Sequence, residues 1–114
     1  MPAHFEVPDE LELILFFGAE AVQRSAQDGY WCYEACDAMS TTLRFSFNLH
    51  ERSVQTVLLR GGHVETSVSH EFADRMLVRD RSLICEFSSK DTATQLTLRL
   101  ADNFSIIWST LRTQ

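Results

Sequence analysis

The chain has 114 residues, a formal net charge of −6 at pH 7, and 45% hydrophobic and 23% charged residues. These values are ordinary for a globular protein and predict a single domain, 1–114, whose core needs no disulfide or metal for stability. The longest apolar stretch is far shorter than the roughly 20 residues of a membrane-spanning helix. Because the first residues also lack the basic start of a secretory signal, we expect a cytoplasmic protein that does not bind membranes.

The negative charge is concentrated at one end of the sequence. Residues 1–41 contain eight Asp or Glu residues and one Arg, a net charge of −7, whereas residues 42–114 contain eight acids and nine bases, a net charge of +1. Binding of phosphate groups requires a basic face, so this distribution argues against nucleic acid as a ligand. It is compatible with a basic protein partner.

The first predicted element is a helical element over residues 9–27. Asp9 can cap the first turn, and Glu12, three residues later, completes a capping box. Gly18 would end the first helix, after which residues 19–27 form either another helical turn or a loop. A strand is the alternative for 10–17, because charged and apolar residues alternate at its start.

Residues 29–111 are predicted to form an antiparallel meander of six to seven strands. Apolar and polar residues alternate over 43–50, 83–88 and 95–100, which is typical of strands with one buried face. Gly61-Gly62 supplies the positive φ angles of a tight hairpin. Since the connections are short, neighbouring strands should pair antiparallel. With the helical element packed across one face of the sheet, the predicted class is α+β with two layers.

No catalytic or metal-binding motif is found in the sequence. His63, Glu65 and His70 come nearest to a set of metal ligands, but they lack the paired spacing of zinc sites. There is neither a Gly-x-Ser-x-Gly turn nor a phosphate-binding glycine loop. We therefore predict that the protein is not an enzyme and holds no cofactor or metal.

Aromatic residues of the first predicted strand, 30–36, lie among acids, a composition that suits a protein interface. The alternative is that these aromatic residues belong to the core and that the acids are an ordinary solvated face. On the interface hypothesis the candidate partner-binding residues are Asp28, Tyr30, Glu34 and Asp37, together with Glu10 and Glu12 of the helical element.

Several short segments carry a resemblance to a known family. They are Leu13–Gly18, Asp28–Trp31, Leu43–Phe47, Ser53–Gln55 and Ile106–Trp108. In these segments, its size and its acidity, the chain resembles the small immunity proteins that protect bacteria from polymorphic toxins, including those of contact-dependent growth inhibition systems. The resemblance implies a cytoplasmic protein that binds a cognate toxin domain, often a basic nuclease, and blocks its active site or an adjacent surface. It transfers no residue role.

A second function remains open from the residues alone. The concave face of the predicted sheet could hold a small molecule without catalysis, with polar groups such as Arg44 or Arg99 converging on an apolar pocket. The oligomeric state is not determined by the sequence.

Overall fold

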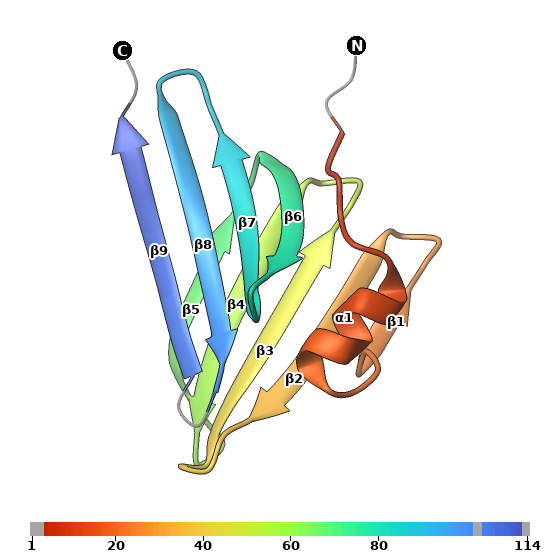
Figure 1. Cartoon of the computed structure of the whole chain (residues 1–114), viewed down its shortest axis with the longest axis vertical. Coiled ribbons are helices and arrows are strands. Elements are labelled where there is room, and N and C mark those ends of the chain that lie inside the picture. The colour runs from red at the N-terminus through yellow and green to blue at the C-terminus, as the bar shows by residue number, and fades with distance from the viewer. Residues whose placement is uncertain (1–3, 102–103, 113–114) are drawn as a thin grey trace.

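The structure is a computed structural model that describes residues 4–101 and 104–112 (Figure 1). Over these residues the chain forms one helix followed by nine strands. They are α1 (Glu10–Phe17), β1 (Gln23–Ser25), β2 (Tyr30–Cys36), β3 (Thr41–Asn48), β4 (Ser53–Arg60), β5 (His63–His70), β6 (Ala73–Arg79), β7 (Ser82–Ser88), β8 (Thr92–Leu100) and β9 (Phe104–Arg112). Within the described ranges, no helix has the length and apolar content needed to cross a membrane.

The strands form two antiparallel sheets, in the orders β1-β2-β3-β4-β5 and β6-β7-β8-β9. Within each sheet, consecutive strands pair antiparallel, as the short connections predicted. The chain passes from one sheet to the other between β5 and β6, where Phe72 adopts a positive φ of 66°. The predicted single meander of six to seven strands is therefore wrong in number and in continuity. Folding the meander back on itself buries apolar faces that one extended sheet would leave in water.

The two sheets share one core between their inner faces. In β7 the alternation is complete, since Leu83, Cys85 and Phe87 are buried and the residues between them are not. Burial raises the pKa of the Cys85 thiol above its ordinary value, which keeps the thiol neutral and unreactive. The largest fully buried side chains come from α1 and from strands of both sheets: Tyr33, Phe45, Phe87, Leu13, Leu43, Leu83, Leu96, Leu98 and Val54.

Helix α1 covers the part of the five-stranded sheet beside β2 (Figure 1). Its Phe17 ring stacks on Tyr33 at a centroid distance of 4.9 Å and on Phe45 at 5.7 Å. The main-chain N–H of Glu12 donates to Asp9 Oδ1 at 2.9 Å, so Asp9 caps the helix as predicted. The helix prediction for 10–17 is confirmed over the strand alternative.

The helical element is shorter than the predicted range 9–27. Gly18 has a φ of 76°, and its N–H donates to Ile14 O at 2.7 Å, which ends the helix. Residues 23–25 form β1 instead of a helical turn, with Gln23 opposite Cys32 of β2. Pairing with an exposed strand edge outweighs the weak local preference of this polar segment.

We predict that Phe17→Ala lowers the free energy of unfolding by about 3–5 kcal/mol, because Phe17 is buried against Tyr33 and Phe45. Met39→Ala in the β2–β3 turn is the control for loss of an apolar side chain, because Met39 is 67% exposed. Its effect should stay within about 0.5 kcal/mol. Urea denaturation followed by circular dichroism measures both. Equal losses would show that the helix does not pack as described.

Candidate protein-binding site

The outer face of the five-stranded sheet is polar. Cys32, Ser46, Gln55 and Ser69 lie opposite one another across β2 to β5 and form one row of this face. The helix packs on the inner face through Phe17, and the second sheet shares the inner core. Within this row Gln55 and Ser69 are exposed, whereas Cys32 and Ser46 are buried. Among the described residues, therefore, the part of the outer face around Gln55 and Ser69 is left open to a partner.

One end of the outer face is hollowed. The hollow has a volume of about 490 Å³. It is lined by Tyr30, Ser46, Phe47, Asn48, Glu51, Ser53, Val54, Gln55, Ser69, His70 and Glu71. Two of these residues carry a carboxylate and none is Lys or Arg. The hollow is therefore suited to a cationic side chain with hydrogen-bonding capacity.

Tyr30 begins β2 at the side of the hollow, opposite Asn48 of β3. Burial raises the pKa of its phenol above the ordinary value, so the hydroxyl stays neutral and can donate or accept a hydrogen bond. The turn before it packs tightly on the β3–β4 connection: a Cβ on Gly29 would lie 3.0 Å from His50 Cδ2. Asn48 Nδ2 also donates to Asp28 O at 3.2 Å. These contacts fix the position of Tyr30 at the side of the hollow.

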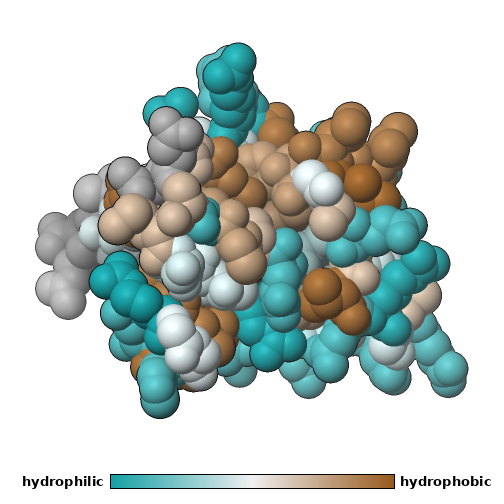
Figure 2. Space-filling view, turned by 90° about the horizontal axis from the view of Figure 1, so that it is seen from below, coloured by the Kyte–Doolittle hydropathy of each residue, from teal (hydrophilic) through white to brown (hydrophobic). Residues whose placement is uncertain are grey.

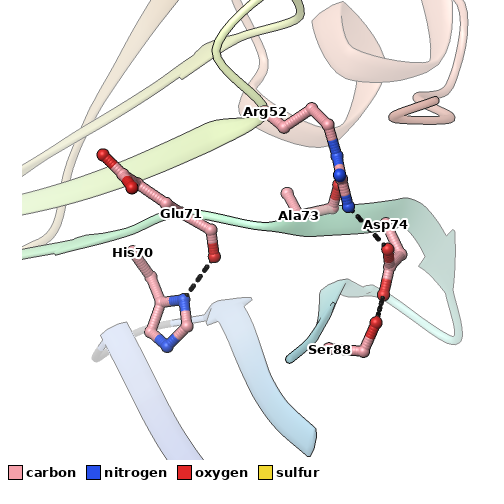
Figure 3. A network of polar contacts seen from close by, with 6 residues as sticks. All are labelled: Arg52, His70, Glu71, Ala73, Asp74 and Ser88. Atoms are coloured by element: carbon pink, nitrogen blue, oxygen red, sulfur yellow. Dashed lines mark hydrogen bonds and ion pairs between the residues drawn. The ribbon is translucent and has the colours of Figure 1, made fainter. Parts of the chain in front are cut away.

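A clamp between the two sheets holds the acidic rim of the hollow (Figure 3). Arg52 Nε donates to Ala73 O at 3.0 Å, and Ala73 N donates to Arg52 O at 3.0 Å. Arg52 Nη2 donates to Asp74 Oδ1 at 2.8 Å, and Ser88 Oγ donates to the other oxygen of the same carboxylate. The clamp thus joins the β3–β4 turn to β6 and β7.

The two rim carboxylates flank this clamp in sequence. Glu51 precedes Arg52, and Glu71 lies two residues before Ala73. Figure 3 shows the Glu71 side chain pointing away from the clamp, while its carbonyl oxygen lies 2.7 Å from His70 Nδ1. The His70 ring is held in turn against Phe87, with centroids 4.6 Å apart. The carboxylates therefore extend from a backbone that is fixed on both sides.

Four of the six residues predicted to bind a partner lie on or near β2. Tyr30 lines the hollow, whereas Asp28 lies in the turn before β2, where its carboxylate accepts a hydrogen bond from Ser25 Oγ at 2.7 Å. Glu34 lies further along the outer face, where its Oε2 is 3.0 Å from Arg44 Nε. Asp37 accepts the N–H groups of Met39 and Thr41, both at 2.9 Å, so its carboxylate stabilises the β2–β3 turn.

The other two predicted residues, Glu10 and Glu12, lie on α1, across the sheet from Glu34. Glu10 Oε2 is 2.9 Å from Arg24 Nη1. The six residues thus do not form one surface, and their role in binding stays a prediction.

Sequence reasoning missed Glu51 and Glu71, which lie 20 residues apart. The hairpin centred on Gly61-Gly62 brings them together, since it sets Val54 opposite His70 at its open end. The sequence signal that could have revealed their proximity was the equal length of β4 and β5, because strands of equal length in a hairpin end side by side.

The groups considered for other chemistry do not converge. His63 and His70 are at opposite ends of β5, which places them roughly 23 Å apart along an extended strand. Over the described part of the chain, no three His, Cys, Asp or Glu residues are grouped to hold a metal ion. Arg44 is on the outer face of one sheet and Arg99 is on β8 of the other, so they do not share a pocket.

We predict that Asp74→Ala, which removes the acceptor of Arg52 and Ser88, lowers the free energy of unfolding by about 1–3 kcal/mol. Hydrogen exchange should also quicken at the β3–β4 turn and around Glu71. Asp91→Ala, in the exposed β7–β8 turn, is the control for loss of one carboxylate. Unchanged exchange at the turn in Asp74→Ala would contradict the clamp.

Comparison with known proteins identifies a shared fold. No family model and no curated protein matches the sequence. Among solved structures, the chain is similar to a chain of a contact-dependent growth inhibition toxin–immunity protein complex from Klebsiella pneumoniae 342, with a TM-score of 0.87 and 20% identity. The similarity covers 93% of this chain and 96% of that chain. At the level of the fold, this confirms the resemblance to proteins of contact-dependent growth inhibition systems.

Proposed function

We propose that the chain is an immunity protein that binds and neutralises a cognate toxin domain through the outer face of its five-stranded sheet. The observation that carries the proposal is the fold shared with a component of a toxin–immunity protein complex, over nearly the full length of both chains. Fold alone does not define a function. The net charge of this chain and the hollow on its outer face are the further support for this function.

A fold from such a complex is compatible with two roles, toxin or inhibitor. The net charge of this chain favours the inhibitor. A toxin that attacks nucleic acid would need a basic face for phosphate groups, whereas this chain carries a net charge of −6. An acidic inhibitor complements a basic toxin and attracts it over a distance, which raises the association rate. The proposed role is therefore binding without catalysis, in the cytoplasm, with a basic toxin such as a nuclease as partner.

The hollow gives this binding a specific anchor. Glu51 and Glu71 provide negative charge at its rim, and Tyr30, Asn48 and Gln55 provide hydrogen-bonding groups within it. A Lys or Arg side chain of the toxin would enter between the carboxylates. Because both carboxylates are exposed in the free protein, they are already hydrated and need no buried partner before binding.

A small-molecule site is the second candidate, favoured by the volume of the hollow. About 490 Å³ falls within the range of small-molecule sites. By residue type, however, nine of its eleven lining residues are polar or charged, and Phe47 and Val54 are the apolar ones. Ligand screening by thermal shift distinguishes this candidate from the toxin inhibitor.

The function is tested by co-expression with the product of the reading frame directly upstream, the place where the resemblance to immunity proteins leads us to expect a toxin. We expect a stoichiometric complex that survives gel filtration at moderate salt, and rescue of cells from that product's toxicity. Neither complex nor rescue would overturn the proposed function.

The site is tested by the double variant Glu51→Lys with Glu71→Lys. Reversal of both rim charges should slow association with the toxin about tenfold at low salt, because steering and the anchor are both lost. Glu86→Lys is a control of the same chemistry on the outward face of the other sheet, where Glu86 faces Arg75. Equal association rates for wild type and the double variant would show that the hollow is not part of the interface.

A further inference from the structure

Helix α1 carries more apolar surface than the core uses. Six of its eight residues are apolar, but only Leu13 and Phe17 are buried. Leu11 is 63% exposed and Leu15, one helical turn later, is 74% exposed. A surface helix normally turns its apolar residues toward the core and its polar residues toward solvent. The exposed stripe of α1 therefore lacks a partner within the described chain.

A groove runs beside this stripe, between α1 and the ends of β6 and β8. Its volume is about 440 Å³, and Leu15, Phe16, Val78 and Leu100 form its apolar lining. Helix α1 and the ends of β6 and β8 lie in the lower half of the molecule in Figure 1. Seen from that end, hydrophobic residues form a broad area bordered by hydrophilic side chains (Figure 2). Continuous apolar surface of this kind marks an interaction site.

The two walls of the groove carry opposite charges. Glu12 lies on the helix wall, and Arg81 lies on the sheet wall in the β6–β7 turn. Arg99 adjoins Arg81 in the next hollow, which extends the basic wall. In the described part of the chain, neither Glu12 nor Arg81 belongs to an ion pair. Both charges are exposed and available to a partner.

From this arrangement we propose that the groove is the interface of a homodimer, with a second copy of this chain as its occupant. A twofold axis makes an interface isologous, so that each contact occurs twice with the roles exchanged. An apolar floor with an acid on one wall and a base on the other is complementary to itself under that operation. Glu12 of each copy then faces Arg81 of the other, while the Leu11 and Leu15 stripes cover each other.

The dimer leaves the candidate toxin-binding site accessible. The groove lies on the helix side of the five-stranded sheet, whereas the hollow with Tyr30 opens on its outer face. The inference therefore does not depend on the proposed function. It can be tested with the purified chain alone, so that its failure and the failure of toxin binding are distinguishable.

The test is sedimentation velocity over a concentration series of the purified wild-type chain. We expect a species of twice the 13.1 kDa chain mass. Leu15→Asp should raise the dimer Kd at least about tenfold, because it places a charge in the apolar floor. Its side chain is already exposed, so the fold should persist by circular dichroism. Val64→Asp, at a residue of β5 that is 61% exposed, is the matched control and should leave the dimer intact.

A charge swap tests the specific pairing. Glu12→Arg alone should weaken the dimer because it faces Arg81 of the other copy, and adding Arg81→Glu should restore it. A wild-type chain that stays monomeric at high micromolar concentration overturns the proposal, as does a dimer that tolerates Leu15→Asp. The proposal also fails if Leu15→Asp abolishes toxin capture by a monomeric wild-type protein, which would assign the groove to the toxin.

Discussion

The structure depends on an aromatic cluster centred on Phe45 and Phe47 of β3. Their rings lie 6.1 Å apart; Phe17 of α1 contacts Phe45 at 5.7 Å, and Trp31 stacks on Phe47 at 5.7 Å. Aromatic side chains bury large areas, so contacts at a few positions can hold several elements together. The cluster sets which face of the five-stranded sheet is inside. By the strict alternation of a strand, it also sets the other face outside.

The outer face can therefore specialise for recognition without disturbing the core. Its central row holds Ser46, Gln55 and Ser69, and the hollow at one end is lined by these polar residues, by acids of the adjoining turns and by Phe47 and Val54 of the core. The Arg52–Asp74 clamp stabilises those turns because it joins both sheets at the point where the chain crosses between them. The clamp therefore contributes to both stability and recognition, because it holds the acidic rim in place and leaves the carboxylates exposed.

The carboxylates of this protein have different roles, and the local environment of each one determines its role. Asp37 and Asp9 accept main-chain N–H groups, and Glu34 is next to Arg44. Such carboxylates are satisfied within the chain and have less to offer a partner. Glu51 and Glu71 lie at an open hollow instead. Net charge therefore describes the long-range attraction of the protein, whereas the contact surface depends on which acids are left exposed.

Local sequence determined most of the secondary structure. The capping residue Asp9, the glycines at 18 and 61–62, and the alternation in β3, β7 and β8 are short-range signals, and the elements follow them. The break at Phe72 into two sheets, the pairing of residues 23–25 as β1, and the meeting of Glu51 with Glu71 were decided only by the tertiary structure. The same holds for the exposure of Leu11 and Leu15, because the sequence shows that a residue is apolar but not whether another segment packs on it. The physical reason is that these features depend on packing between segments distant in sequence, whose free energy no local pattern contains.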